Sequence, residues 1–231
     1  MRFFYAKEIQ PLHQLEEDES KHMVRVLRGQ IGDVFQLTDG KGRLYEGILS
    51  ISDKKSCVLK TTLVKEEQRT ADQLTLVIAP TKSTDRFEWL LEKAMEYGVA
   101  CIQPIWTARS ERKTEKEDRW NRILISALKQ SNQCWLTELR PAISWSTWLE
   151  TCPDHGFIAH CLDEKKDHWF DCPIRGVASW IAIGPEGDFS PEEIKQATDK
   201  GIRGVSLGNQ RLRTETAGLA AIQMHALANR D

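Results

Sequence analysis

The chain has 231 residues, of which 40% are apolar and 29% charged, as in a folded protein with room for one large domain or two modest ones. Its formal net charge is −2, whereas nucleic-acid-binding proteins usually carry a basic excess, so composition by itself does not indicate an RNA ligand. No apolar run is long enough to cross a bilayer, and the first residues lack the apolar segment of a secretory signal. We therefore expect a cytoplasmic protein without a membrane partner.

The first 65 residues have the pattern of a small β-barrel. Three short β-like runs alternate with turn signals, a spacing that is typical of compact all-β folds. A short helix ended by Gly29 is expected before the strands, and a polar linker after them. The expected helix covers residues 19–28, the expected strands cover 34–37, 44–49 and 56–60, and the expected linker covers 65–70.

From residue 73 onward, strands alternate with helices, which predicts a mostly parallel sheet with helices on its faces. Asp85, with Glu88 three residues later, is the expected cap of the first helix. A later helix is expected to have Ser190 as its N-cap, Pro191 at its first position and Glu193 at the capping-box position. The expected strands cover 74–79, 99–105, 156–162, 178–183 and 203–207, and the expected helices begin near 85, 118, 191 and 214.

Six cysteines are scattered without a Cys-x-x-Cys pair, as expected for reduced thiols in the cytosol. Between residues 152 and 172 three cysteines lie near three histidines, but their spacings do not repeat as those of zinc ligands do. The expected strand at 156–162 would also point His160 and Cys161 to opposite faces. We therefore favour packed thiols over a zinc site and expect no metal.

An apolar strand runs into the turn Gly184-Pro185-Glu186-Gly187, and the turn runs into the capped helix. Ligands of open α/β sheets bind beyond the carboxyl ends of strands, and glycine lets a ligand approach the backbone. Alone, the turn fits a capped loop without a ligand equally well. The dinucleotide fingerprint and the phosphate-binding loop are both absent, which argues against an NAD-dependent oxidoreductase and a nucleoside triphosphatase.

A second strand, turn and helix follow at residues 205–220. Arg213 and Glu215 alternate here with the hydroxyl residues Thr214 and Thr216. Glu215 would stabilise the positive end of the helix dipole even without a catalytic role. Arg213 could equally be a surface residue without a functional role. Two turn-rich strand ends in succession nevertheless favour a shared pocket.

Together the two segments resemble the ribosomal RNA small subunit methyltransferase E family, in the SPOUT class of S-adenosylmethionine-dependent enzymes. The matching motifs are Gly184-Pro185-Glu186-Gly187-x-Phe189-Ser190 and Leu207-Gly208-x-x-x-Leu212-Arg213-Thr214-Glu215-Thr216-Ala217. The chain departs from the family pattern at Asp188, often a second glycine, and at Gln133, often an arginine. Gln210 and Arg211 also replace a commoner arginine and aliphatic residue.

The resemblance implies an α/β fold in which residues 1–70 form a PUA-like RNA-binding β-barrel domain and residues 71–231 a SPOUT methyltransferase domain. The latter would have a mostly parallel sheet and a C-terminal trefoil knot. The resemblance further implies a homodimer that uses S-adenosylmethionine to methylate N3 of one uridine in 16S ribosomal RNA, on the assembled small subunit. The implied cofactor-binding residues are Ala159, His160, Ile183, Gly184, Pro185, Glu186, Gly187, Leu207, Gly208, Leu212, Thr214, Thr216 and Ala217.

For catalysis we expect Arg213 to stabilise developing negative charge or to grip phosphate, and Glu215 to act as a base or an orienting partner. A mixed-charge strip between residues 109 and 122, which includes Arg112 and Lys113, is either an RNA contact or a solvated helix start. The open alternatives are a SPOUT enzyme with a different rRNA or tRNA target, and a non-catalytic RNA-binding homologue. The expected RNA-binding residues are Arg2, Lys21, Arg25, Arg28, Lys82, Arg86 and Arg109.

Overall fold

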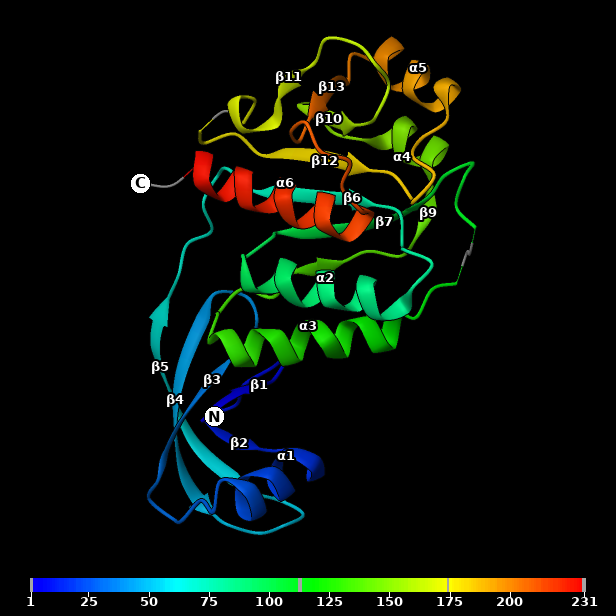
Figure 1. Ribbon diagram of the computed structural model, residues 1–231. Helices are drawn as coiled ribbons and strands as arrows, with labels where there is room; N and C mark the ends of the chain where they lie inside the picture. The colour runs from blue at the N-terminus through cyan, green and yellow to red at the C-terminus, as the bar shows by residue number, and fades with distance from the viewer. Residues whose placement is uncertain (1, 112–113, 174, 230–231) are drawn as a thin grey trace. The chain divides into compact units, whose positions relative to one another are not determined.

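The computed structural model describes residues 2–111, 114–173 and 175–229, so Arg112 and Lys113 of the charged strip lie outside the described residues (Figure 1). Contacts divide the chain into two compact units. The first comprises Met1–Arg69 and Ile125–Leu136, and the second comprises Thr70–Leu124 and Thr137–Asp231.

A five-stranded sheet forms most of the first unit, in the strand order β1-β3-β4-β5-β2. Only β1 and β3 pair in parallel, and the other pairs are antiparallel. The three expected strands are confirmed, but the last of them continues through residue 66, inside the expected linker, because Glu66 still pairs with Arg43. The elements are β1 (Phe3–Tyr5), β2 (Leu12–Gln14), α1 (Glu17–Lys21), a π-helical turn (His22–Val26), β3 (Val34–Thr38), β4 (Arg43–Ile51) and β5 (Val58–Glu66).

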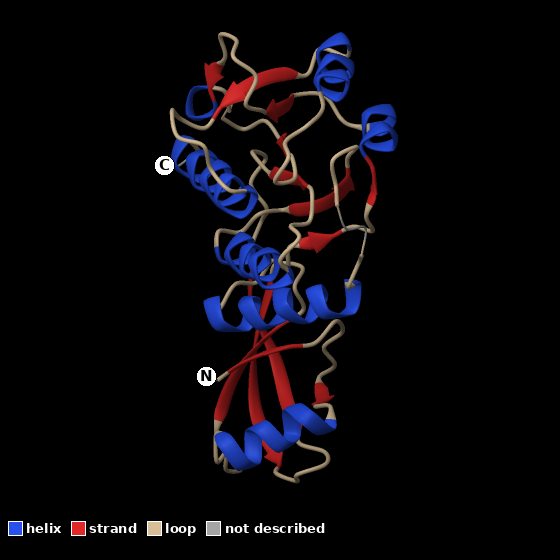
Figure 2. Cartoon of the chain, turned by 45° about the vertical axis from the view of Figure 1, so that its right-hand side comes forward, coloured by secondary structure: helices blue, strands red, loops and turns tan. Residues whose placement is uncertain are grey.

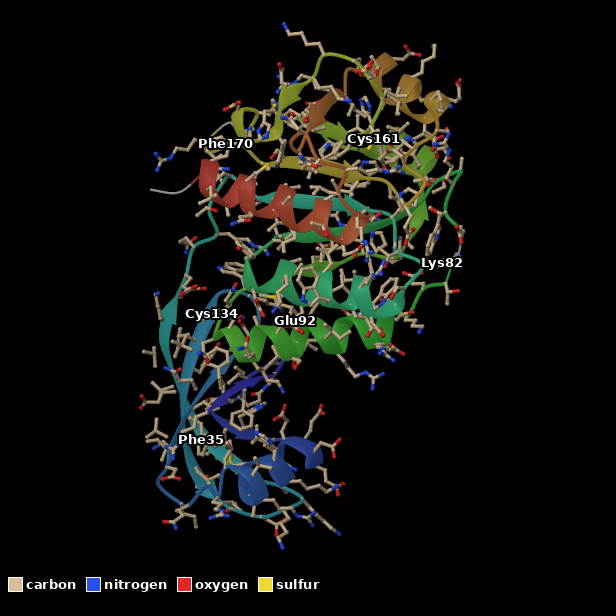
Figure 3. The ribbon with its side chains drawn as sticks, in the orientation of Figure 1. Phe35, Lys82, Glu92, Cys134, Cys161 and Phe170 are labelled. Carbon is tan, nitrogen blue, oxygen red and sulfur yellow. The ribbon has the colours of Figure 1, made fainter. Side chains whose placement is uncertain are left out.

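The core of this unit lies between the sheet and the short helix. Phe35, labelled in Figure 3, meets Phe4 edge to face with ring centroids 5.8 Å apart. Met23 from the helical turn is fully buried in the same core. The segment 125–136 joins the unit through polar contacts. Lys129 pairs with Glu19 at 2.7 Å between Nζ and Oε1.

The second unit contains a parallel sheet in the order β11-β13-β10-β12-β6-β7-β8, with β9 paired to β7. Every pairing in it is parallel, which confirms the alternation of strands and helices that the sequence predicts. The strands are β6 (Leu74–Ile78), β7 (Cys101–Trp106), β8 (Glu138–Leu139), β9 (Ile143–Ser144), β10 (Gly156–Ala159), β11 (Asp167–His168), β12 (Ser179–Ile183) and β13 (Arg203–Ser206).

Helices cover both faces of this sheet. On one face α6 (Thr214–Ala228) lies beside α2 (Thr84–Glu96), and Gly218 permits this approach because a Cβ there would stand 3.0 Å from Ile78 and from Leu90 (Figures 1 and 2). On the other face α4 (Trp145–Thr151) and α5 (Pro191–Asp199) pack into an aromatic-rich core. Phe87 of α2 contacts Trp120 of α3, which spans Glu117–Ser131.

Two expectations about these elements are wrong. The first helix begins at Thr84 with Ser83 as its N-cap, and Asp85 is a first-turn residue that favours the dipole without capping the helix. Strand β10 ends at Ala159, because its ladders with β12 and β13 stop there, so His160 and Cys161 belong to the following loop. No helix in the described parts of the chain is long and apolar enough to span a membrane.

Candidate functional site

A cavity of about 780 Å³ opens beyond the carboxyl ends of three neighbouring strands, β10, β12 and β13. Three loops wall it: 159–166, 183–188 and 205–214, with Ala217 of α6 below. All three belong to the second unit. This is the place at which ligands bind in open α/β sheets, and two of the three walls are the motifs of the sequence.

The wall after β12 is a tight turn held by its own backbone and by Asp188. The amide of Asp188 donates to the carbonyl of Pro185 at 2.8 Å, and Asp188 adopts a left-handed φ of 63°. Its carboxylate accepts from the amide of Phe189 through Oδ1 and from the amide of Cys161 through Oδ2, each at 2.8 Å. Asp188 therefore ties the turn to the loop after β10, where Figure 3 labels Cys161.

The expected capping box after this turn is confirmed. Ser190 Oγ accepts from the amide of Glu193 at 3.2 Å, and Glu193 Oε2 accepts from the amide of Ser190 at 2.8 Å. Glu193 Oε1 also accepts from the amide of Ala108 at 2.7 Å. Arg109 donates to the carbonyl of Gly187 at 2.7 Å. The loop after β7 thus supports the turn from outside the cavity.

The third wall runs from β13 into α6. Thr214 Oγ1 donates to the carbonyl of Gly184 at 3.1 Å, a buried bond that joins the two motifs. Arg213 is exposed and lines the cavity. Glu215 is buried outside the lining, with Oε1 3.6 Å from Nε of Arg86. The two expected catalytic residues therefore face different surroundings.

His160 is a buried histidine in the cavity wall, with Nε2 3.2 Å from Oε1 of Glu164. Lys166 Nζ lies 3.5 Å from Nδ1 and donates to the carbonyl of His160 at 3.0 Å. Burial, and then the charge of Lys166, lower the pKa of His160, although Glu164 and Asp188 oppose this. The lowered pKa favours the neutral ring, in which Nδ1 can accept from Lys166. Sequence patterns gave no signal for Lys166 or Glu164, because their contact depends on the loop conformation.

The structure brings together all the expected cofactor residues except Gly187 and Thr216. Gly187 faces away, since its carbonyl accepts from Arg109, and Thr216 is exposed on the first turn of α6. The walls combine the apolar side chains of Ile183, Leu207 and Leu212 with glycine backbone and with carboxylates. Among the described residues no three histidine, cysteine or acidic side chains are grouped as a metal site would require.

The expected RNA-binding residues divide between the units: Arg2, Lys21, Arg25 and Arg28 belong to the first, and Lys82, Arg86 and Arg109 to the second. Several have intramolecular partners. Lys21 pairs with Glu17 at 2.8 Å, and Lys82 pairs with Glu111 at 2.6 Å.

Comparison with known proteins identifies the family. A model of an RNA methyltransferase domain matches residues 67–226, and a model of an RNA methyltransferase PUA domain matches residues 15–62. Ribosomal RNA small subunit methyltransferase E of Synechocystis is 30% identical over 214 residues, which cover 89% of this chain and 70% of that protein. The chain belongs to the ribosomal RNA small subunit methyltransferase E family of RNA methyltransferases.

Solved structures of the family share the whole fold. A protein of Porphyromonas gingivalis described as a probable rRNA methyltransferase is 40% identical, with a TM-score of 0.89 and 96% coverage of both chains. Ribosomal RNA small subunit methyltransferase E of Neisseria gonorrhoeae, solved bound to S-adenosyl methionine, is 29% identical with a TM-score of 0.84, covering 96% of this chain and 95% of that one. The resemblance in the two motifs therefore extends over the PUA and methyltransferase parts together.

Proposed function

We propose that the cavity binds S-adenosylmethionine and that this RNA methyltransferase places the methyl group on N3 of one uridine in 16S ribosomal RNA of the small subunit. The observation that carries the proposal is the convergence of both family motifs on one cavity at the carboxyl ends of β10, β12 and β13. Curated relatives that cover most of the chain are named ribosomal RNA small subunit methyltransferase E, which supports the substrate class.

The cavity suits this donor in size and in lining. Ligand pockets of small molecules enclose about 300–1,000 Å³, and the cavity of about 780 Å³ falls within that range. Ile183, Leu207 and Leu212 would pack against the adenine ring, while the backbone at Gly184 and Gly208 would approach it closely. The bound donor would supply an electrophilic methyl group on a positively charged sulfur.

The nucleobase must lose its N3 proton before that nitrogen can attack, and the negative charge then spreads to the neighbouring carbonyl oxygens. Arg213 lines the cavity and has no ion-pair partner among the described residues, so its guanidinium is available to stabilise this charge. Glu215 does not line the cavity. We assign it the orienting role, in which it positions Arg86 at 3.6 Å beside the start of α6.

Three further features belong to the same proposal. The C-terminal segment would form a trefoil knot, which the return of α6 across β6 and β12 after β13, two strands beyond β12, supports. The enzyme would act as a homodimer in the cytoplasm, as the family resemblance implies. The near-neutral charge favours an assembled small subunit over naked RNA as the substrate, because recognition would then depend on shape.

A donor titration combined with methyl transfer tests the proposal. We expect calorimetry to detect S-adenosylmethionine binding, and we expect labelled methyl groups to appear in 16S RNA of subunits that lack the modification. Binding without transfer to any RNA would identify a non-catalytic homologue. Transfer to transfer RNA but not to the small subunit would identify a different target.

A further inference from the structure

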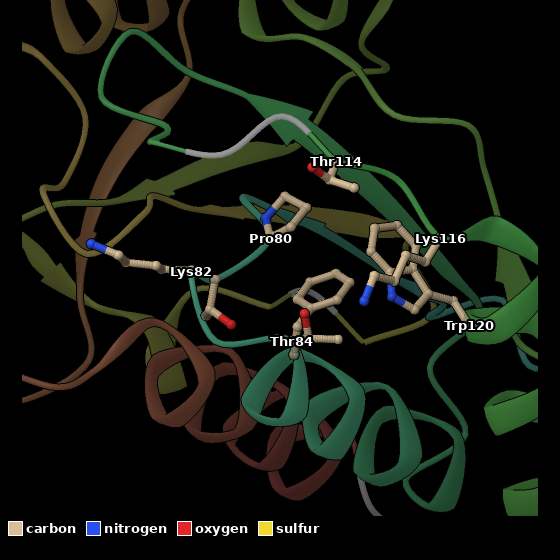
Figure 4. Close-up of a pocket in the computed structure, with 8 residues that line it drawn as sticks. Pro80, Lys82, Thr84, Thr114, Lys116 and Trp120 are labelled. Atoms are coloured by element: carbon tan, nitrogen blue, oxygen red, sulfur yellow. The ribbon is translucent and has the colours of Figure 1, made fainter.

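A second, much smaller cleft lies at the start of α2, within the second unit (Figure 4). Its volume of about 20 Å³ admits one water-sized group and excludes a nucleobase. None of the lining side chains is a carboxylate. The lining residues are Pro80, Thr81, Lys82, Thr84, Phe87, Thr114, Lys116 and Trp120.

The indole of Trp120 supplies a hydrogen-bond donor that lacks an acceptor. The residue is 3% exposed, and its ring packs against Phe87 with centroids 4.8 Å apart. Its Nε1 is buried and has no hydrogen-bond partner among the described residues. Figure 4 shows Trp120 and Lys116 reaching into the cleft. A buried donor left unpaired costs about 1–3 kcal/mol, so an acceptor atom in the cleft would be stabilised.

Other groups around the cleft also favour an acceptor with negative charge. The N-cap residue Ser83 makes no side-chain bond to the first turn of α2, so the amides at this positive helix end lack a cap. Lys116 is half-buried and has no carboxylate partner in the described part of the chain. Asp85 belongs to the same helical turn and Glu111 pairs with Lys82, but neither carboxylate lines the cleft.

A hydrogen bond also connects the cleft to the cofactor cavity. The backbone amide of Lys82, which lines the cleft, donates to Oε1 of Glu186 at 2.9 Å, and Glu186 lines the cavity. A polyanion bound at the cleft would therefore also pass close to the turn that contains Glu186, next to the cavity in which methyl transfer would take place. Of the polyanions, RNA is the one that this family modifies.

We propose that the cleft binds one non-bridging phosphate oxygen of the substrate RNA, close to the nucleotide that enters the cavity. Trp120 Nε1 and the ammonium group of Lys116 donate to this oxygen, and the first turn of α2 adds its dipole. The proposal rests on the proposed function only for the identity of the RNA.

Two variants of the full-length protein test the proposal. Trp120→Phe removes the N–H but keeps an aromatic ring against Phe87, and Lys116→Gln removes the charge. Lys195→Gln is the matched control, because Lys195 is an exposed lysine of α5, paired with Asp199 and outside both pockets. The affinity for unmodified small subunits is measured over a series of salt concentrations, and KM and kcat are measured for methyl transfer to these subunits. The affinity for S-adenosylmethionine is measured separately.

We expect Lys116→Gln to weaken RNA binding about tenfold and to reduce the slope of log affinity against log salt by about one, as for a single lost phosphate contact. Trp120→Phe should raise KM for RNA several-fold and leave kcat and the salt slope unchanged. The control should change neither, and donor affinity should stay constant throughout.

An unchanged salt slope and RNA affinity in Lys116→Gln would overturn the proposal and leave the cleft as a water site. If Trp120→Phe fails to fold, the RNA affinity and salt slope of Lys116→Gln still test the proposal. Absence of donor binding by the wild type would contradict the proposed function instead, so the two failures are distinguishable.

Discussion

The carboxylate of Asp188 accepts a hydrogen bond of 2.8 Å from the backbone amide of Cys161, and both residues line the cofactor cavity. This bond fixes the loop after β10 to the turn after β12. A glycine at position 188 could not provide this cross-link, because both bonds are accepted by the carboxylate.

Replacement of Asp188 should weaken the contact between these two loops. Asp188→Gly removes both accepted bonds but tolerates the φ of 63°, whereas Asp188→Ala removes the bonds and adds backbone strain. We expect donor affinity to fall about tenfold in Asp188→Gly and further in Asp188→Ala, since hydrogen bonds to charged groups contribute about 1.5–3 kcal/mol. Calorimetric titration measures this. Wild-type affinity in both variants would show that the cross-link does not shape the site.

Arg213→Ala should slow the chemical step. Loss of one charge-stabilising donor typically costs about 10²–10³-fold in rate. We therefore expect kcat to fall by that order while the affinity for S-adenosylmethionine stays near the wild-type value. Arg213→Lys, which keeps a positive charge, should recover part of the rate. Full activity of Arg213→Ala with unchanged RNA affinity would remove Arg213 from the mechanism.

Substitution of Glu193 should destabilise the fold more than loss of the cap residue. Ser190→Ala removes one capping bond and should cost about 1 kcal/mol. Glu193→Ala removes the bonds to Ser190 and Ala108 from a buried carboxylate and should cost about 3 kcal/mol. Urea unfolding of the two variants gives both values. Equal costs would mean that the bond to Ala108 contributes nothing.

Stability should decrease in mild acid because of buried histidines. Burial lowers the pKa of His225, although the charge of Asp72 opposes this, so the unfolded chain takes up a proton near pH 6.5 that the folded chain does not bind at that pH. The stabilisation is complete above that pH and is lost as the pH falls below it. His225→Phe should flatten the dependence of the unfolding free energy on pH between about 7 and 5. An unchanged slope would assign the effect to His160 and His13, whose pKa values burial also lowers.

The sequence predicts best those features that short-range chemistry determines. The capping box of Ser190 and Glu193 is local, and it formed as expected. Helix α4 was not expected, although Ser144 caps it by accepting from Thr147. The helix is only seven residues long, and its buried face consists of just Trp145, Trp148 and Leu149. The end of β10 at Ala159 depends on its partners β12 and β13, which no local pattern reveals.

The same contrast holds at the site. The two glycine-containing motifs predicted most of the cavity wall, since both follow strands of one parallel sheet. The direction in which the individual residues of these motifs point could not be predicted from the sequence. Gly187 turns its carbonyl to Arg109, and Glu215 turns from the cavity to Arg86, because tertiary partners 78 or more residues away attract them. The roles of Lys166 and Glu164 around His160 likewise require the folded loop.

We propose above all that this enzyme methylates N3 of one uridine in small-subunit RNA. The most direct measurement is mass spectrometry of nucleosides from unmodified small subunits that have been incubated with the protein and isotopically labelled S-adenosylmethionine. We expect labelled 3-methyluridine at a single position of 16S RNA. Label in a ribose methyl group, at uracil C5 or in another base would contradict it.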